Sequence, residues 1–368
     1  MGKPLRCALI LAGGSGVRLW PMSRTELPKQ LIPLAGGHSL LERAVERLAG
    51  LIPASEVYIC ASQRQRGRIL DALDGFPEDR FIGEPVGRDT LAAIGVSAAI
   101  IGRRDPEAVM AVFTADHLIE PADVFREIVA RGYDLVERHR DTLVTFGIEP
   151  DCASTGFGYL ELGEPRDEGA FSLRKFQEKP ALAIAQEYFA AGPSRYLWNS
   201  GMFVWRVPTI LDCIRRYHPE SFDRFQRIAA AWDTPARDVV LRGMYGELEK
   251  ISIDYAVMEP ASHDASVRVA AIPMRLRWLD VGSWSAFGKA LEPDERGNAV
   301  SGARAVLRDT SRTLIASNDP KHVIAAIGCE DLIIVHTANA TLVCRADEAE
   351  AVKQLHATIR ERFGEEYV

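Results

Sequence analysis

The chain of 368 residues lacks the motifs that mark several common classes of protein. None of its six cysteines stands in a Cys-x-x-Cys pair, and its eight histidines form neither His-x-His nor His-Glu-x-x-His, so we expect no zinc site. No apolar run reaches the ~18 residues of a membrane span, and no apolar leader core precedes the first predicted strand. We therefore expect a cytoplasmic protein with reduced thiols and no membrane partner.

Basic residues are also fewer than acidic residues. Lys and Arg number 44 against 51 Asp and Glu, and the formal net charge is −7. A nucleic-acid partner would require a basic surface, so we expect none. Hydrophobic residues make up 47% of the chain, which is enough for a large core without disulfides. Cations that bind an anionic substrate would therefore have to be concentrated at one site.

The most informative stretch that is present is a glycine-rich loop directly after an apolar run. Residues 7–12 predict a buried strand, and Gly13-Gly14-Ser15-Gly16 follows it. A loop with so few side chains can turn its backbone N–H groups onto a phosphate chain. Arg18 and Lys29 bring two cations to the same place, which indicates a polyanionic substrate. A glycine loop alone could equally be a plain turn between a strand and a helix.

Two familiar phosphate-binding loops do not match this one. The Walker A pattern needs a lysine directly after its last glycine, whereas Lys29 lies thirteen residues beyond Gly16. The dinucleotide fingerprint needs a third glycine at the position that Leu19 occupies. These mismatches argue against a P-loop NTPase and against an NAD-dependent oxidoreductase.

Strand-like and helix-like segments alternate in the first half of the chain, which favours an α/β fold with a parallel-dominated sheet. Ligands then lie at the carboxyl ends of the strands, where the glycine loop and Asp116 fall. Ser39-Leu-Leu-Glu42 has the pattern of a capping box at a helix start. The predicted strands span residues 7–12, 57–61, 109–114 and 143–147, and the predicted helices span 39–48, 90–102 and 124–138.

The composition changes near residue 293. Short β-rich runs follow at a spacing of about nine or ten residues, which suggests a small sheet or solenoid. A closing helix is predicted from Asp347 to about residue 362, with Ala351, Val352, Leu355 and Ile359 on one face. We therefore predict two domains, residues 1–293 and 294–368. The β-rich runs are residues 305–307, 313–316, 323–327, 332–336 and 340–344.

Pro28-Lys29-Gln30 and seven further blocks follow the glycine loop in order. Together they resemble the nucleotidyltransferases that make nucleotide sugars, and most closely the mannose-1-phosphate guanylyltransferases, also called GDP-mannose pyrophosphorylases. The resemblance covers nearly the whole chain. The blocks are 83–90 (GEPVGRDT), 114–117 (TADH), 156–159 (GFGY), 176–180 (FQEKP), 197–203 (LWNSGMF), 253–259 (IDYAVME) and 278–284 (WLDVGSW).

The resemblance implies a Rossmann-like catalytic domain with a mixed, mostly parallel sheet, and a small C-terminal domain like a left-handed β-helix. It implies transfer of GMP from GTP to mannose 1-phosphate, giving GDP-mannose and pyrophosphate, by in-line attack on the α-phosphorus. We expect a homodimer, and we expect no room for the isomerase domain of longer, bifunctional relatives. The same chemistry with another sugar 1-phosphate or another nucleotide is an alternative, as is a regulatory relative that has lost catalysis. Such a relative would be free to lose part of the set Arg18, Lys29, Asp116, Lys179 and Asp280, which is complete here.

The resemblance also assigns two metal ligands, Asp116 and Asp280. Each follows an apolar run that predicts a strand, and Mg²⁺ takes one or two carboxylates while leaving its other positions to phosphate and water. From spacing alone, Asp116 could instead cap the helix near Asp123, and Asp280 could cap a turn into Gly282. We expect Mg²⁺ as the cofactor.

The nucleotide is assigned to the glycine loop, its two cations and a guanine pocket near residues 84–90. This pocket departs from the family, because the usual Arg-Asn-Thr-Ala-Pro-Ala reads here as RDTLAA from Arg88 to residue 93. Asp89 is a pure acceptor, which suits guanine N1–H and N2–H₂, but it could simply cap the following helix. The assigned residues are Leu11, Ala12, Gly13, Gly14, Ser15, Gly16, Arg18, Lys29, Glu84, Pro85, Arg88, Asp89 and Thr90.

The sugar phosphate is assigned to Gly158, Glu178, Lys179, Asn199 and Asp254. Lys179 would meet its phosphate, and Glu178, Asn199 and Asp254 would receive sugar hydroxyls. Gly158 would let the chain approach the sugar ring. The alternatives are a solvated surface ion pair for Glu178-Lys179 and a turn former for Asn199.

Overall fold

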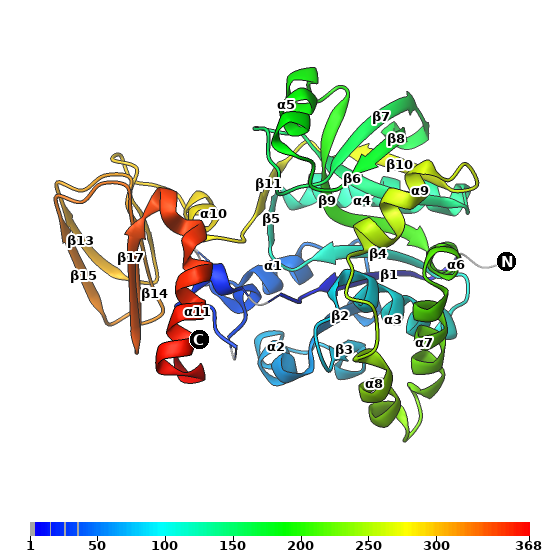
Figure 1. Ribbon diagram of the computed structural model, residues 1–368, viewed down its shortest axis with the longest axis horizontal. Helices are drawn as coiled ribbons and strands as arrows, with labels where there is room; N and C mark the ends of the chain where they lie inside the picture. The colour runs from blue at the N-terminus through cyan, green and yellow to red at the C-terminus, as the bar shows by residue number, and fades with distance from the viewer. Residues whose placement is uncertain (1–3, 15, 26, 35–36) are drawn as a thin grey trace.

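The computed structural model describes residues 4–14, 16–25, 27–34 and 37–368 (Figure 1). Within these residues, nine strands form one mixed sheet in the order β3-β2-β1-β4-β9-β6-β10-β8-β7. The glycine loop leaves β1 in the parallel half of the sheet. The strands are β1 Arg6–Leu11, β2 Val57–Ser62, β3 Phe81–Glu84, β4 Val109–Thr114, β6 Thr142–Ile148, β7 Tyr159–Pro165, β8 Phe171–Gln177, β9 Tyr196–Arg206 and β10 Arg268–Pro273.

Side chains alternate along the central strands, and each face of the sheet carries its own core. Cys7 and Leu9 of β1 belong to the core under α3, α6, α7 and α8, whereas Ala8 and Ile10 belong to the core under α1, α2 and α4. This burial on both faces explains why β1 is an unbroken apolar run. The helices are α1 Leu40–Glu46, α2 Arg66–Ala72, α3 Asp89–Arg104, α4 Ala122–Arg138, α5 Leu182–Ala191, α6 Val207–Tyr217, α7 Pro219–Ala231, α8 Arg237–Tyr245 and α9 Glu259–His263.

The mixed sheet was predicted, but its antiparallel share is larger than "mostly parallel" implies. Strands β3, β2, β1 and β4 pair in parallel, as do β6 and β10. Strand β9 is antiparallel to both β4 and β6, and β7 and β8 form an antiparallel hairpin. Antiparallel strands can be joined by a short turn, whereas parallel strands need a long crossover. The helix–strand alternation that suggests a parallel sheet does not extend to this half of the domain.

The local predictions in the first half are confirmed to within a few residues. The segment 109–114 is β4, and the predicted helix 90–102 is the core of α3. The capping box is present at the start of α1, where the backbone N–H of Ser39 donates to Glu42 Oε2 at 2.7 Å and the N–H of Glu42 donates to Ser39 Oγ at 3.2 Å. Helix α3 is rich in small residues because it packs closely on its neighbours: a Cβ at Gly95 would overlap the Phe225 ring of α7.

The C-terminal part, residues 299–368, consists of short strands that stack in two parallel walls beside the larger part (Figure 1). Strands β12, β14 and β16 are parallel neighbours in one wall, β13 and β15 in the other, and β17 closes the first wall in antiparallel fashion. Except for β12, these strands match the predicted runs. The strands are β12 Ala299–Ser301, β13 Arg304–Arg308, β14 Leu314–Ser317, β15 Val323–Ile327, β16 Leu332–Thr337 and β17 Ala340–Arg345.

The predicted closing helix is only partly correct. Residues Ala346–Ala351 form a 3₁₀ turn, and the α-helix α11 spans Val352–Phe363. Val352 is buried and Ile359 is partly buried as predicted, but Ala351 is exposed and Leu355 is 41% exposed. Ala351 lies in the 3₁₀ turn, outside α11. Within α11 the buried side follows Val352, His356 and Ile359, an i, i+4, i+7 stripe that leaves Leu355 at its edge.

The segment that carries Arg18 and Lys29 is held between the large sheet and the C-terminal part. Leu19, Trp20 and Met22 share a core with Val335 and Leu342 of β16 and β17. The Trp20 indole N–H donates to the carbonyl of Tyr367 at 2.6 Å, and Figure 1 shows α11 beside this segment. The C-terminal part therefore packs against the segment that carries Arg18 and helps to hold it in place.

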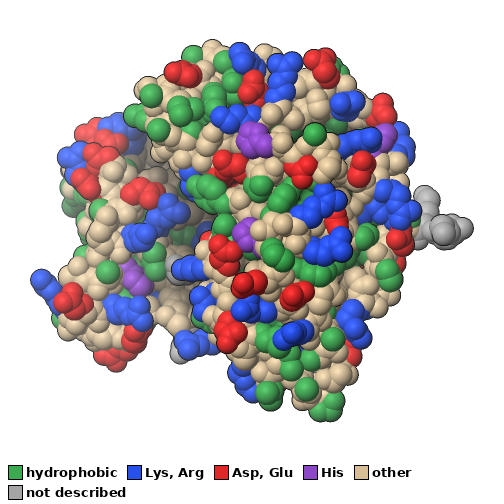
Figure 2. All heavy atoms as spheres, turned by 45° about the vertical axis from the view of Figure 1, so that its right-hand side comes forward, with side chains coloured by type: hydrophobic (Ala, Val, Ile, Leu, Met, Phe, Trp, Pro, Cys, Tyr) green, Lys and Arg blue, Asp and Glu red, His purple; other side chains and the backbone are tan. Residues whose placement is uncertain are grey.

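The surface mixes charges of both signs. On the face in Figure 2, acidic and basic side chains are interspersed, and a hollow separates a smaller body from the larger one. Across the described ranges, no helix is both long and apolar enough to span a bilayer.

Candidate active site

Lys29 and Asp116 form a partly buried ion pair at the carboxyl ends of β1 and β4. Lys29 Nζ lies 2.5 Å from Asp116 Oδ2, and the two side chains are 12% and 19% exposed. Burial alone would lower the pKa of Lys29, but the charges of Asp116 and Asp280 outweigh it and the pKa is raised. Burial would raise the pKa of Asp116, and the Lys29 ammonium outweighs this to lower it. Both groups are therefore charged at neutral pH.

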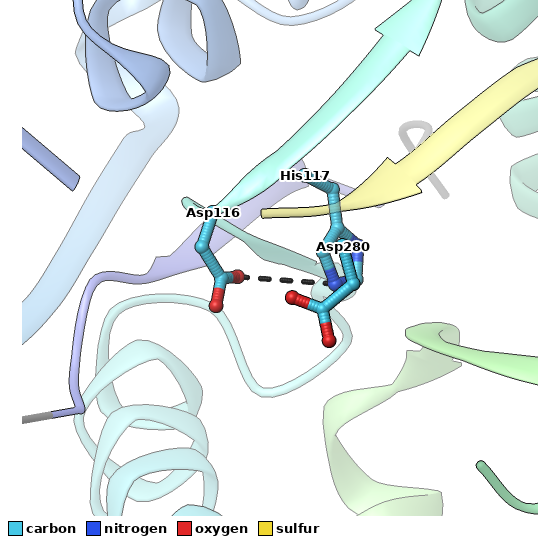
Figure 3. Close-up of side chains that lie close together, drawn as sticks. All are labelled: Asp116, His117 and Asp280. Carbon is cyan, nitrogen blue, oxygen red and sulfur yellow. Dashed lines mark ion pairs between the residues drawn. The ribbon is translucent and has the colours of Figure 1, made fainter. Parts of the chain in front are cut away.

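Asp280 is brought to this pair by a small second sheet that the sequence did not predict. Strand β5 (His117–Glu120) pairs antiparallel with β11 (Arg277–Asp280), and Asp280 stands opposite His117. Figure 3 shows the three side chains together, and one potential ligand atom of each lies within 4.8 Å of the others. Asp280 Oδ1 is buried and has no hydrogen-bond partner among the described residues. Buried polar atoms in proteins are normally paired, so this oxygen is a candidate ligand for a cation or acceptor for a hydrogen-bond donor.

His117 is held in one tautomer by Trp278. The Trp278 indole N–H, which can only donate, lies 3.2 Å from His117 Nδ1, so this nitrogen carries no proton. In the neutral ring, Nε2 carries the proton, and it lies 3.8 Å from Asp116 Oδ1. Burial lowers the pKa of His117, which favours the neutral ring. His117 therefore presents a donor to the cluster, and the two aspartates are the groups that can ligate a metal.

Neither aspartate caps a helix. Strand β5 lies between Asp116 and α4, whose N-cap position is Pro121. At the other site, Ser283 is the N-cap of α10 (Trp284–Lys289), and its side chain accepts from the N–H of Ala286 at 3.4 Å. The capping alternative for Asp116 is therefore wrong. For Asp280, the Oδ1 atom accepts no hydrogen bond from the turn at Gly282 in the described part of the chain.

Arg18 reaches the same cluster from the other side. A Cβ on Gly282, two residues after Asp280, would lie only 2.9 Å from Arg18 Nη2, so the glycine makes room for the guanidinium. Arg18 Nη1 also pairs with Glu350 Oε2 of the C-terminal part at 2.9 Å. These side chains are 41% and 69% exposed. An ion pair this exposed is worth about 0–1 kcal/mol, so a phosphate can readily take the place of Glu350.

Two glycines of the loop adopt a backbone conformation that favours glycine. Gly14 and Gly16 have φ of 105° and 59°, in the left-handed region where glycine is favoured. Gln30, which directly follows Lys29 and was not assigned a role, donates its amide to the Gly13 carbonyl. At the foot of the loop, the N–H of Ala12 donates to the Cys60 carbonyl at 2.8 Å. Leu11 ends β1, and the predicted Ser15 lies outside the described residues.

Glu84 is placed next to the glycine loop at the end of β3. Its carboxylate is buried, and Oε2 lies 3.7 Å from the position that a Cβ on Gly13 would take. Its other oxygen, Oε1, accepts the O–H of Tyr245 at 2.6 Å. No sequence motif indicated Tyr245 as a residue of the site. Pro85 follows directly and is partly exposed.

The other predicted pocket residues make contacts within the protein. Arg88 donates to the carbonyl of Gly246, and Thr90 Oγ1 accepts the N–H of Ile253 at 2.8 Å. Asp89 is exposed with φ of 64°, and its Oδ1 accepts the N–H of Thr90 at 2.8 Å. It thus satisfies one of the first N–H groups of α3, although Arg88 occupies the N-cap position. The Asp89 carboxylate therefore accepts a backbone N–H at the start of α3, in line with the capping alternative. It does so from the first residue of the helix instead of from the N-cap position.

A second cluster gathers the residues assigned to the sugar phosphate. Asn199 accepts from Thr145 Oγ1 at 2.9 Å and donates to Asp254 Oδ1 at 2.8 Å. Lys179 pairs with Glu178, whose side chain is buried and whose Oε2 has no partner in the described part of the chain. A Cβ at Gly158 would overlap this oxygen, so Gly158 makes room for the Glu178 carboxylate. Glu178 is not the solvated surface group of the alternative reading.

Aromatic side chains connect the two clusters. Trp278, which holds His117, contacts Phe157 with ring centroids 5.3 Å apart. Phe157 contacts Trp198 at 4.9 Å, directly before Asn199 in β9. Such ring contacts give the wall between the clusters a defined shape. The His117 cluster and the Asn199 cluster are thereby linked by a continuous row of packed rings.

Asp254 titrates in an unusual range. Burial and the neighbouring Glu178 carboxylate raise the pKa of Asp254 to about 7. Because its ordinary value is near 3.8, the folded state binds more protons than the unfolded state between these values, and stability falls as pH rises through this window. We predict that Asp254→Asn raises the melting temperature at pH 8 by roughly 2–4 °C.

Thermal melts at pH 8 and pH 5 check this prediction, because the gain should narrow at pH 5. Asp134→Asn is the control, since Asp134 is 47% exposed in an ion pair with Arg6. An equal gain of Asp254→Asn at both pH values would contradict the prediction.

Fold and site together have the layout of a nucleotidyltransferase: a glycine loop at the end of a first parallel strand, an adjacent cluster of carboxylates and cations, and a second cluster of polar side chains. The family model described as Nucleotidyl transferase matches residues 7–297, which is most of the chain. The model described as MannoseP isomerase/GMP-like beta-helix domain matches residues 303–357, in agreement with the stacked strands.

Curated relatives narrow the class. A mannose-1-phosphate guanylyltransferase of Klebsiella pneumoniae is 35% identical over 98% of this chain and 75% of its own length. The enzyme of the same name from Escherichia coli K12 is 35% identical over 96% of this chain and 73% of its own. A crystal structure named mannose-1-phosphate geranyltransferase from Thermus thermophilus superposes with a TM-score of 0.84 and 31% identity, covering 96% of this chain and 99% of that one. The chain belongs to the mannose-1-phosphate guanylyltransferase family of nucleotidyl transferases.

Proposed function

We propose that this enzyme transfers GMP from GTP to mannose 1-phosphate and releases pyrophosphate. The observation that carries the proposal is the partly buried Lys29–Asp116 pair beside Asp280, whose buried Oδ1 has no partner in the described structure. The glycine loop adjoins this cluster. The relatives named for this reaction share about a third of the residues of this chain.

The reaction needs positioning and charge compensation more than acid–base chemistry. The attacking sugar phosphate is already an anion, so no activating base is required. Two polyanions must instead approach each other, and fixed cations offset their charge as the bond to pyrophosphate breaks. Lys29 would contact the α-phosphate region and Arg18 the departing pyrophosphate. Exchange of Glu350 for phosphate would free Arg18 for this role.

Asp116 and Asp280 would hold Mg²⁺. Their two carboxylates, one with a buried unpartnered oxygen, fit a hard divalent cation that keeps phosphate and water as its other ligands. The ion would supply positive charge between the phosphate groups. His117 would remain outside the ligand set, because its Nε2 carries the proton in the neutral ring and lies 3.8 Å from Asp116 Oδ1, beyond hydrogen-bond distance.

The second cluster would hold the acceptor. Lys179 would bind its phosphate, and the free oxygen of Glu178 would accept a sugar hydroxyl, with Asn199 and Asp254 beside it. Asp254 donates only when protonated, so it could serve as either donor or acceptor near pH 7. We also propose a homodimer in the cytoplasm, with the domain boundary at residue 293, and light scattering tests the dimer.

A pyrophosphate-release screen over four nucleotides and several sugar 1-phosphates tests the proposed function. We expect GTP with mannose 1-phosphate to give the highest kcat/KM, by at least about tenfold over ATP or dTTP, because an acceptor at the base site leaves an unpaired group against the wrong base. Equal rates with ATP or dTTP would contradict guanylyl transfer and favour the alternative with another nucleotide. A better sugar 1-phosphate than mannose 1-phosphate would reassign the acceptor.

A further inference from the structure

Tyr245 connects the end of α8 to the end of β3. Its O–H donates to Glu84 Oε1 at 2.6 Å across a sequence separation of 161 residues, and both side chains are buried. A buried charge-assisted hydrogen bond of this kind is strong and directional. It fixes the plane in which the Glu84 carboxylate lies, because rotation would leave a buried donor and a buried acceptor unpaired.

The bond leaves the other carboxylate oxygen facing the glycine loop. Glu84 Oε2 lies 3.7 Å from the Cβ position of Gly13, which is the side on which a nucleotide would lie. Burial raises the pKa of Glu84, and the Tyr245 hydrogen bond acts against this rise. Tyr245 thus helps to keep Glu84 an acceptor.

The same end of α8 also holds a second residue of the predicted base pocket. Arg88 donates to the carbonyl of Gly246, the residue after Tyr245. The backbone of this turn is anchored in the core through Leu248 and Tyr245. Glu84 and Arg88 are therefore both held by the turn at Tyr245 and Gly246, which lies far from them in the sequence.

We propose that Tyr245 is a positioning residue for nucleotide selectivity, which holds Glu84 so that its carboxylate accepts the N–H groups on the pairing edge of guanine. This inference rests on the proposed function. Guanine offers the two adjacent donors N1–H and N2–H₂ on that edge, whereas at the same two positions adenine offers the acceptor N1 and a C–H, its only donor, N6–H₂, being at the other end of the edge. A fixed acceptor therefore rejects adenine, and an acceptor free to turn away rejects it less well.

The test compares kcat/KM for GTP and for ATP in Tyr245→Phe, which removes only the hydroxyl. We expect the GTP:ATP ratio to fall roughly tenfold, as for loss of one hydrogen bond to a charged group, while the KM for mannose 1-phosphate stays within about twofold. Tyr133→Phe is the matched control: Tyr133 is equally buried on the opposite face of the sheet, and its O–H donates to the Cys7 carbonyl at 2.7 Å.

Two further variants show that Tyr245 acts through Glu84. Glu84→Gln should lower the ratio, and adding Tyr245→Phe to it should lower the ratio no further, since coupled residues are not additive. Glu84→Asp keeps the charge but withdraws the carboxylate from Tyr245, so it should lower the ratio even if Tyr245→Phe does not fold.

A wild-type GTP:ATP ratio in Tyr245→Phe or in Glu84→Asp would overturn the inference. An equal fall in Tyr133→Phe would also overturn it, because the effect would then be general loosening of the core. Failure of the proposed function is distinguishable from both outcomes, since the wild-type enzyme itself would then release no pyrophosphate from GTP and mannose 1-phosphate.

Discussion

Asp116→Asn and Asp280→Asn should each lower turnover by roughly 100-fold or more, the usual cost of removing a contact that stabilises charge in the transition state. The two side chains lie within one cluster, and each amide replaces an anionic ligand by a neutral one. Asp116→Asn also removes the partner of Lys29. Steady-state pyrophosphate release at saturating substrates measures the effect.

Metal binding has to be measured apart from activity. We expect calorimetric titration with Mn²⁺, a spectroscopically useful substitute for Mg²⁺, to show weakened binding in both variants in the presence of GTP. Asp134→Asn, in an exposed ion pair with Arg6, is the control and should bind and turn over normally. Full activity of the wild-type enzyme in excess chelator would rule out a metal-assisted reaction.

Lys179→Ala and Arg18→Ala should weaken the binding of different substrates, mannose 1-phosphate and GTP respectively. Lys179 lies in the cluster of Glu178 and Asp254, whereas Arg18 lies beside Gly282. We expect Lys179→Ala to raise the KM for mannose 1-phosphate about tenfold or more, and Arg18→Ala to raise that for GTP similarly, as for loss of a charge-assisted hydrogen bond. Both should also slow turnover, because each cation offsets charge that changes during transfer.

Calorimetry of GTP binding to Lys179→Ala is the sharper measurement. Near-normal affinity for GTP with lost affinity for mannose 1-phosphate would support two separate clamps. Lys321→Ala is the control, because Lys321 is an exposed lysine in a turn of the C-terminal part. Lost GTP binding in a folded Lys179→Ala protein would instead place this lysine on the nucleotide.

Much of the fold could be predicted because its signals are local. The alternation of apolar runs and helical faces located β1, β2, β4 and β6, and the capping box located the start of α1. The antiparallel half was harder, because β9 receives its neighbours from distant parts of the chain. Leu355 was misplaced because the buried stripe of α11 passes through Val352 and Ile359 and leaves Leu355 at its edge, and an apolar face does not show how wide its contact is.

For the site, the sequence by itself determined the family and the candidate side chains: the glycine loop, Arg18, Lys29 and the carboxylates stand in motifs whose order indicates the family. Only the tertiary structure decided how they are held. The pairing of β5 with β11 sets Asp280 opposite His117, and Tyr245 reaches Glu84 from another element. Each of these contacts joins residues more than a hundred positions apart, and a local pattern has no means of recording a partner that packing alone brings near.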